Sequence, residues 1–477
     1  MKEHAERSLG LPLPTAPDTP ALQRKLSSVG VLLLTLSSLS PVFSIFGVGS
    51  DVLQHAGTGA VGLFLLAFGV AVIYAVVYAE LGSAFPYAGG DYVGVGTILG
   101  GGAGVVVLAL WAVSTGPSIA FEAKLVGIYV DELVPALPAW AVTFGALAAA
   151  MAISLMAARV GALVTGIFLA VELVAVCVLS AGGLWHPTLG LHAVIAHPLA
   201  INASGALGPV ALGTLAVGAV SAACGTIGGA QAIYFGEELA DPHRQMGRVV
   251  LMAGLIGAVT IVVPVIAVVL GAPHLREVLA SPAPLATFIS QIAGPWAARA
   301  LSAAVALAIF NAMIAQIMSQ SRLFFSLGRD AVFHGAINQI LAKVDRVSGV
   351  PRAATLVVVA LSAPCCLLAT HTLLVFLAGL LVYAWGLVCI AVLVGRSKDL
   401  TAKAGYWRSA LFPLAPILGL AMAACFAIAD WDDPSAGRPS LIIMGATAIL
   451  AALWYQLVLK RRPGGWMPRL GESGACD

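Results

Sequence analysis

Long apolar stretches, separated by short segments rich in charged residues, proline or glycine, run through almost the whole chain. A transmembrane helix needs about 20 predominantly apolar residues to cross the hydrocarbon core of a bilayer. Twelve stretches reach about this length, and we predict a transmembrane helix in each. They lie at 29–51, 60–84, 99–129, 138–157, 161–184, 209–235, 249–271, 298–325, 352–369, 372–394, 409–429 and 440–459. The pattern predicts an all-α integral membrane protein.

Composition supports this interpretation, because hydrophobic residues make up 60% of the 477 residues and charged residues only 10%. Soluble domains carry roughly a quarter charged residues, so this chain cannot cover a water-facing surface of comparable size. The net charge of +2 gives no reason to expect a nucleic-acid partner. The seven cysteines show no metal-ligand spacing, and we expect neither a metal nor a cofactor.

The distribution of Lys and Arg predicts the orientation, since cytoplasmic loops of membrane proteins are enriched in basic residues. If the N-terminus is cytoplasmic, every Lys and Arg falls in a cytoplasmic segment except Lys124, Arg276, Arg299 and Arg438. The opposite topology would place the basic segments outside. We therefore expect a multi-pass protein of the cell membrane with both termini in the cytoplasm.

Two predicted helices contain clusters of residues that interrupt a helix. The stretch 40–49 holds Pro41, Gly47 and Gly49, and the stretch 223–231 holds three glycines within five residues. Irregular backbone at membrane depth survives only where it lines a cavity or is buried in protein. Small residues that permit close helix packing are the alternative explanation. We favour broken helices because each cluster lies in the first helix of a set of five, a pattern typical of transporters built from inverted repeats.

These patterns divide the chain into five parts. Residues 1–28 form a polar, proline-rich arm without a secretory signal, which we expect to be disordered. Residues 29–184 hold helices 1–5 and residues 209–394 hold helices 6–10, as two topologically matching repeats. Residues 409–459 hold two further helices, and residues 460–477 form a tail.

The interruptions predict a binding site near the middle of the membrane. A broken helix offers free N–H groups and a partial positive charge for a carboxylate, and free carbonyl groups for an ammonium group. Neither interruption contains a charged residue, which favours neutral amino acids or amines over strongly charged ones. Asn311 either faces this site or serves helix packing. The candidate substrate-binding residues are Phe43, Ser44, Ile45, Phe46, Gly47, Trp111, Gly225, Thr226, Ile227, Gly228, Gly229 and Asn311.

Three motifs resemble those of amino acid–polyamine–organocation (APC) permeases. They are AELGSAFPYAGGDY at 79–92, EELADPHR at 237–244, and the stretch with Ser321-Arg322, Arg329-Asp330 and Gly349-Val350-Pro351. The resemblance covers helices 1–10 and implies a LeuT-like 5+5 inverted repeat with two additional helices. It also implies secondary transport of an amino acid or related amine.

The sequence departs from the family pattern in two places that concern the site. Phe43-Ser44-Ile45 stands where many relatives carry a glycine-containing triplet, with the glycines displaced towards Gly49. The second interruption lacks the aromatic gate residue that relatives often place there. The resemblance therefore implies either a roomier pocket or a gate formed by Phe43, Phe46 or Trp111.

Acidic residues within or beside the predicted helices are candidates for coupling and gating. Glu172 lies near the centre of helix 5, where a carboxylate is costly unless it is paired, hydrated or protonated. Similar proton-coupled proteins carry a lysine near this position, so the resemblance implies a coupling role; a purely structural carboxyl group is the alternative. Glu122 either lines an outer vestibule or has no role in binding. Three further carboxylates at helix ends are expected to pair with Arg159, Arg244 or Arg322; they are Glu80, Glu237 and Glu238.

The sequence therefore predicts a secondary active transporter with alternating access, a small-molecule substrate and proton coupling. Exchange of one amino acid or amine for another is the alternative mode of transport. A membrane receptor that retains the fold without transporting is the alternative class. The chain contains neither a P-loop pattern nor a nucleophile–base arrangement, so we do not expect an enzyme.

Overall fold

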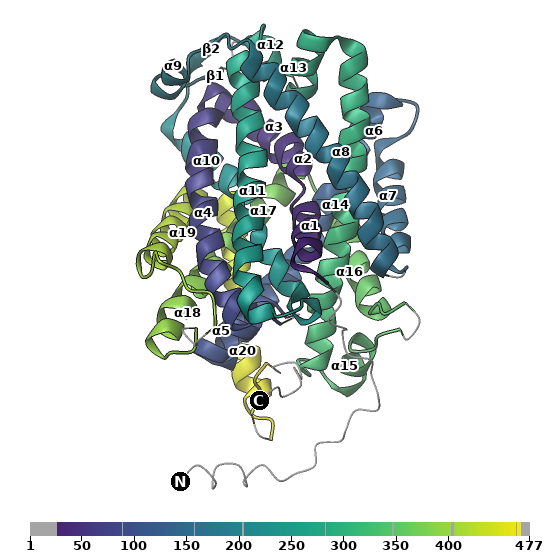
Figure 1. Cartoon of the computed structure of the whole chain (residues 1–477), viewed down its shortest axis with the longest axis vertical. Coiled ribbons are helices and arrows are strands. Elements are labelled where there is room, and N and C mark those ends of the chain that lie inside the picture. Colours follow the sequence, from purple (N-terminus) through teal and green to yellow (C-terminus); the bar gives the residue numbers. More distant parts are fainter. Residues whose placement is uncertain are drawn as a thin grey trace.

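A computed structural model describes residues 26–468 apart from 88, 157, 203–204, 282, 346–347, 402–404 and 464, and only the backbone of 158–165, 167, 371 and 378. Most of the predicted N-terminal arm and residues 469–477 of the predicted tail lie outside the described residues. The long helices run roughly parallel to the long axis of the molecule and form a bundle (Figure 1). A helix pairs its backbone groups internally, as hydrocarbon surroundings require.

The N-terminal part of the chain is mostly helical and includes one short π-helical and one short 3₁₀ segment. Its elements are α1 (Ser28–Leu39), α2 (Pro41–Phe43), the π-helix η1 (Ser44–Gly49), α3 (Ser50–Ala56), the 3₁₀ helix η2 (Gly57–Gly59), α4 (Ala60–Ala84), α5 (Asp91–Leu99), α6 (Gly101–Leu133), α7 (Ala139–Ser154) and α8 (Ala158–Trp185).

The remainder of the chain adds a small hairpin and further helices. Its elements are α9 (Leu191–Ala196), β1 (Leu199–Ile201), β2 (Leu207–Pro209), α10 (Leu212–Thr226), the 3₁₀ helix η3 (Gly229–Glu238), α11 (Pro242–Gly271), α12 (Leu275–Ala280), α13 (Pro284–Ala293), α14 (Pro295–Arg329), α15 (Gly335–Leu341), α16 (Arg352–Cys365), α17 (Thr370–Leu380), the π-helix η4 (Leu381–Trp385), α18 (Gly386–Ser397), α19 (Leu414–Asp432), α20 (Gly437–Trp454) and the π-helix η5 (Tyr455–Leu459). The two strands pair antiparallel, with Leu199 opposite Pro209.

Every one of the twelve predicted stretches coincides with a helix, but their lengths differ from the prediction. Within the described residues, nine helical stretches are long and apolar enough to cross a membrane. The first two predicted helices belong to one helical run, Ser28–Ala84. Two further predicted membrane helices correspond to helices that are too short to be counted among the nine: α7 has 16 residues and α16 has 14. The chain is a multi-pass membrane protein with mostly helical structure.

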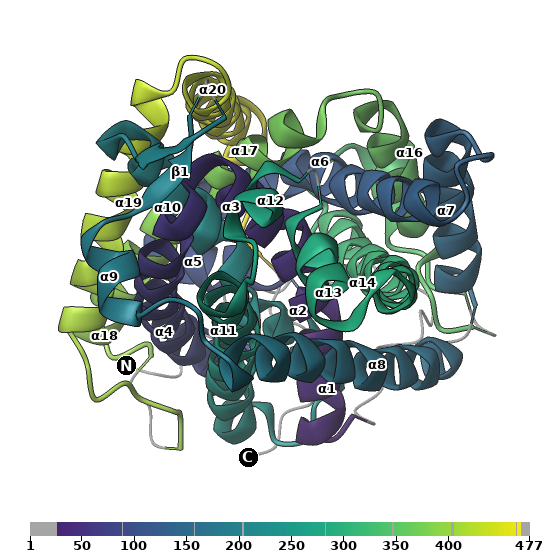
Figure 2. The ribbon, with the colours of Figure 1, turned by 90° about the horizontal axis from the view of Figure 1, so that it is seen from above.

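The centre of the bundle is formed by helices from both predicted repeats. Helix α11 packs along α4 and α8, and α14 packs along α6 and α8. Helix α1 packs against α11, α8 and α14. Seen from above, α19 and α20 lie at the edge of the bundle (Figure 2). The small hairpin lies against α3 and η2, in the middle of the first helical run, where a Cβ atom on Gly57 would come within 2.1 Å of the Leu199 carbonyl oxygen. With a φ of 56°, this position requires glycine.

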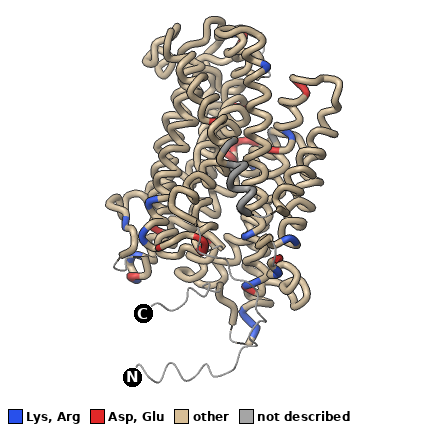
Figure 3. Tube along the Cα trace, turned by 45° about the vertical axis from the view of Figure 1, so that its right-hand side comes forward, with Lys and Arg blue, Asp and Glu red and all other residues tan. Residues whose placement is uncertain are grey.

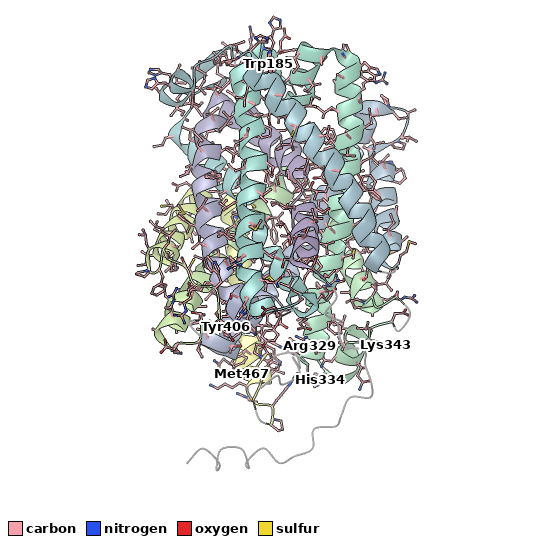
Figure 4. The ribbon with its side chains drawn as sticks, in the orientation of Figure 1. Trp185, Arg329, His334, Lys343, Tyr406 and Met467 are labelled. Atoms are coloured by element: carbon pink, nitrogen blue, oxygen red, sulfur yellow. The ribbon has the colours of Figure 1, made fainter. Side chains whose placement is uncertain are left out.

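Charged residues gather at one end of the bundle, which we call the charged end (Figure 3). Arg329 and Lys343 lie there, and Trp185 lies at the opposite end (Figure 4). Three carboxylates of the charged end form ion pairs: Glu80 with Arg396, Glu237 with Arg329, and Glu238 with Arg322.

Only one of these pairs uses an arginine that the sequence analysis proposed. The pairing of Arg322 with Glu238 is confirmed, at 2.9 Å. Arg244 instead lies 4.0 Å from Asp241, in an exposed contact. The side chain of Arg159 lies outside the described residues. The partners of Glu80 and Glu237 come from later helices, whose position relative to α4 and η3 the sequence could not specify.

Candidate functional site

The first helical run is interrupted at Ser40. Helix α1 ends at Leu39, Ser40 adopts a φ of 39° and a ψ of 94°, and Pro41 begins the next helical segment. The Ser40 hydroxyl accepts a hydrogen bond from the backbone N–H of Phe43 at 3.2 Å, as an N-cap residue does. Gly47 and Gly49 lie further along, in the π-helix η1. The interruption is therefore present, but it lies at the serine–proline step and not at the glycines.

The second interruption follows α10. Ile227 is extended, with a φ of −94° and a ψ of 148°, and η3 begins at Gly229 as a 3₁₀ helix. The two interruptions lie side by side, because a Cβ atom on Gly228 would approach Leu39 Cδ1 to 2.3 Å. This close approach explains why glycine occupies position 228.

A cavity of about 140 Å³ lies beside the two interruptions, and we call it the central cavity. A water molecule occupies about 30 Å³ in the liquid, so this volume is sufficient for a small organic molecule. Six of the predicted binding residues line the central cavity: Phe43, Ser44, Trp111, Gly225, Ile227 and Gly228.

The other six predicted binding residues do not line the central cavity; they are Ile45, Phe46, Gly47, Thr226, Gly229 and Asn311. They serve packing and local hydrogen bonding instead. Phe46 packs edge-on against Tyr129, with 5.9 Å between ring centroids. The Thr226 hydroxyl donates to the Ala222 carbonyl at 2.6 Å, within its own helix. Neighbouring residues of a helix point in different directions, so a continuous stretch cannot face one cavity throughout.

Glu172 of α8 lies at the first interruption but outside the central cavity. Its carboxylate oxygen Oε2 accepts a hydrogen bond from the Ser40 hydroxyl at 2.9 Å. The Asn311 side chain and the Val42 backbone lie beside the same carboxylate, and Asn311 also donates to the Ser37 hydroxyl at 2.8 Å. Glu172 is fully buried. This carboxylate is therefore placed to act on the end of the broken helix and not on a molecule in the cavity.

Two carboxylates that the sequence analysis did not place in the site line the central cavity: Asp91 and Glu122. Asp91 begins α5, and its Oδ2 atom accepts hydrogen bonds from the Trp111 indole N–H at 2.9 Å and the Tyr78 hydroxyl at 3.1 Å. Asp91 belongs to the motif at 79–92, and membership of that motif is the sequence feature that could have identified it as a candidate site residue. Glu122 had been considered only for an outer vestibule, because the rotation of α6 about its own axis is not readable from an apolar helix.

A chain of polar side chains crosses one wall of the central cavity. The Ser38 hydroxyl donates to Gln231, Gln231 Nε2 donates to Gln316 Oε1 at 3.2 Å, and Gln316 Nε2 donates to the Ser118 hydroxyl at 2.6 Å. These four residues come from α1, η3, α14 and α6. The chain therefore connects both interrupted helices to two continuous ones, and all four residues border the cavity.

The chemistry available in the cavity is that of binding. Among the described residues, no group of three or more His, Cys, Asp or Glu side chains is arranged to hold a metal ion. The cavity instead offers carboxylates, amides, hydroxyls, aromatic rings and the ends of interrupted helices.

Comparison with known proteins agrees with this description. A search of curated proteins finds no match. A family model described as amino acid permease matches residues 26–457, which is most of the chain and includes both interruptions and the central cavity. Its members are transporters and not enzymes. The chain therefore belongs to the amino acid permease family of the APC superfamily.

Proposed function

We propose that this permease is a secondary active transporter that moves an amino acid or related amine by alternating access. The observation that carries the proposal is the central cavity beside two adjacent helix interruptions, deep within an apolar bundle. We further propose twelve membrane-spanning segments, in two inverted sets of five plus two, in the cell membrane. Both termini are cytoplasmic in this arrangement, so the charged end faces the cytoplasm.

The interruptions supply the two halves of a zwitterion site. The first N–H groups of η3 have no partner within the helix and carry a partial positive charge, which suits a carboxylate. The last carbonyl groups of α10 carry the opposite partial charge and suit an ammonium group. Gly225, Ile227 and Gly228 border the cavity between these two helix ends. A small amino acid is therefore held by backbone groups in this proposal.

We propose that Glu172 couples transport to protons. Its carboxylate binds the Ser40 hydroxyl, which also caps the helical segment beginning at Pro41. Adding or removing one proton changes which of these groups donates, and so changes the stability of the interruption. Obligatory exchange of two substrates is the alternative mode, in which Glu172 stays in one protonation state.

Alternating access would move the interrupted helices relative to the rest. In this mechanism the first, second, sixth and seventh predicted helices rock against helices 3–5 and 8–10. The chain from Ser38 to Ser118 links these two groups, since Ser38 and Gln231 belong to the first group and Gln316 and Ser118 to the second. We propose that the hydrogen bond between Gln231 and Gln316 breaks and reforms in each cycle.

The test is uptake by the purified protein in lipid vesicles, using a panel of labelled amino acids and amines with and without a pH gradient. We expect the gradient to drive accumulation, and Glu172→Gln to abolish accumulation while substrate exchange persists. Glu277→Gln, an exposed carboxylate outside the cavity, is the matched control. Accumulation that survives Glu172→Gln would refute the coupling role. Binding without any uptake or exchange would instead identify a receptor.

A further inference from the structure

Two acidic side chains border the otherwise largely apolar central cavity, and no basic side chain among the described residues balances them. Asp91 and Glu122 both border the cavity, and the described residues that line it include no Lys, Arg or His. The zwitterion site formed by backbone groups leaves these two carboxylates without a function. Their presence therefore points to a property of the substrate that the helix interruptions do not explain.

Glu122 is the more informative of the two. It is only 2% exposed, and its Oε2 atom has no hydrogen-bond partner among the described residues. Leaving a buried polar group without a hydrogen-bond partner destabilises a protein, and leaving a buried charge unpaired destabilises it more. A buried carboxylate with an unpartnered oxygen at the wall of a cavity is the arrangement expected where a ligand supplies the missing partner.

Asp91 is held differently and lies elsewhere in the cavity. Two donors, the Trp111 indole and the Tyr78 hydroxyl, fix one of its oxygens. Trp111 and Glu122 both lie on α6, 11 positions apart, which corresponds to about 16 Å along the helix axis. The two carboxylates are therefore not a chelating pair for one ion. They are separate acidic positions along the cavity.

Aromatic rings form much of the remaining wall. Tyr74 stacks on Tyr78 with 4.3 Å between ring centroids, and Tyr74 also packs against Trp385 at 5.6 Å. All three rings border the cavity. Faces of Tyr and Trp rings attract ammonium and guanidinium groups, while their apolar surface accommodates the methylene chain that carries such a group. An acidic, aromatic wall disfavours anions and favours organic cations.

We infer that the substrate of this permease carries a net positive charge and that Glu122 binds its side-chain ammonium or guanidinium group. This inference rests on the proposed transport function and replaces the expectation of a neutral substrate, which considered only the interruptions. Asp91 provides a second, weaker position for the same group, because one of its oxygens already has two donors. Glu122 thereby becomes a specificity-determining residue.

Two kinds of molecule supply this chemistry. A basic amino acid would place its carboxylate at the N-terminus of η3 and its side-chain cation at Glu122. A linear diamine has no carboxylate and would use only the acidic and aromatic wall. The Trp385 indole N–H and the Tyr234 hydroxyl, both at the cavity, have no hydrogen-bond partner in the described part of the chain, and they are additional donors that only the amino acid would satisfy.

The experiment compares binding of labelled L-lysine, 1,5-diaminopentane and L-norleucine to the full-length protein in lipid vesicles. L-norleucine has the carbon chain of lysine without its side-chain ammonium group. We expect lysine or the diamine to bind at least tenfold more tightly than norleucine. Glu122→Gln should weaken binding of the cation about tenfold and leave norleucine binding unchanged, and Glu122→Asp should restore part of the affinity. Asp91→Asn should have a smaller effect.

The possible results separate this inference from the function on which it rests. Tighter binding of lysine identifies a basic amino acid, and tighter binding of the diamine identifies an amine; both support a cationic substrate. Binding of norleucine equal to or tighter than both cations overturns the inference while transport of amino acids stands. A protein that binds and transports none of a full amino acid and amine panel overturns both. Size-exclusion profiles and melting temperatures of the variants exclude misfolding as the cause of a loss.

Discussion

Carboxylates at the charged end are paired with arginine side chains, whereas the carboxylates at the central cavity have no basic side chain beside them among the described lining residues. Both oxygens of Glu80 accept hydrogen bonds from Arg396, at 2.9 and 2.8 Å. Glu122 is as deeply buried as Glu80, at 2% against 1% exposure, yet one of its oxygens has no partner among the described residues. Burial alone therefore does not distinguish these residues; the presence of a counter-charge does.

We interpret the paired carboxylates, such as Glu80, as structural and the carboxylates without a counter-charge, such as Glu122, as ligand-binding. A buried ion pair adds little net stability but fixes geometry, because each ion is costly without the other. At the charged end, such pairs join helices that are distant in sequence, as Glu80 of α4 and Arg396 of α18 do. An unpaired carboxylate reduces the stability of the empty protein. Such local conflicts are expected at functional sites.

The largest effect should follow from creating an unpaired carboxylate at the charged end. Arg396→Ala leaves Glu80 buried without its ion-pair partner, and we expect a loss of about 3 kcal/mol in stability. The measurement is the melting temperature of the purified protein in detergent. Arg276→Ala, which removes an exposed arginine, is the control.

A double variant makes this test sharper. Glu80→Gln combined with Arg396→Ala removes the buried charge as well as its partner, so part of the lost stability should return. If the double variant is no more stable than Arg396→Ala, the defect comes from lost packing of the arginine on Phe412 and not from an unpaired charge.

An intermediate effect should follow from disturbing the contact between the two interruptions. Gly228→Ala places a methyl group within 2.3 Å of Leu39 Cδ1, and overpacking of this kind costs about 2 kcal/mol. We expect weaker substrate binding in a vesicle binding assay, because the cavity walls must separate. Gly145→Ala, with no atom within 4 Å of the new Cβ, is the matched control. Adding Leu39→Ala should restore binding; failure to do so would mean that the contact does not shape the site.

The smallest effect should have the opposite sign. Glu122→Gln replaces a buried carboxyl group, which must either carry a charge without a counter-charge or take up a proton on folding, with a neutral amide, so we expect the stability of the empty protein to rise by about 1 kcal/mol. The measurement is the melting temperature without any added substrate. A substrate that stabilises the unaltered protein should stabilise this variant less. A fall in melting temperature would show that Glu122 is paired in the empty protein and would place it with the carboxylates of the charged end.

Much of the fold could be predicted from the sequence, because apolar length is a direct requirement of the bilayer. All twelve predicted stretches coincide with helices. The hairpin of Leu199–Ile201 and Leu207–Pro209 was not predicted, since three-residue strands carry almost no periodic signal. The first interruption was predicted within 40–49, with Pro41, Gly47 and Gly49 as its signals. The helix ends at the first of these, where Ser40 leaves the helical region and Pro41 lacks an N–H group, and not at the glycines.

The site was less predictable than the fold. Residues Gly225 to Gly228 could be proposed because an interrupted helix must border a cavity, and Gly225, Ile227 and Gly228 do so. Glu122 could not be assigned to the cavity because α6 has no clear amphipathic pattern that would tell which face is turned inward. The pairing of Trp111 with Asp91 requires the mutual placement of α5 and α6, which only the three-dimensional structure supplies.

The hydroxyl group of Ser40 takes part in two hydrogen bonds, as the acceptor in one and as the donor in the other. The backbone N–H of Phe43 donates a hydrogen bond to its oxygen, while the hydroxyl itself donates one to Glu172 Oε2. If Glu172 is protonated, its carboxyl group can donate a hydrogen bond to the serine oxygen, and the hydroxyl hydrogen then points to another acceptor. Through this one serine, a change in the protonation of Glu172 in α8 would alter the hydrogen bonding at the break between α1 and α2. Replacing Ser40 with glycine would keep the backbone conformation of the break but remove the hydroxyl group that links it to Glu172.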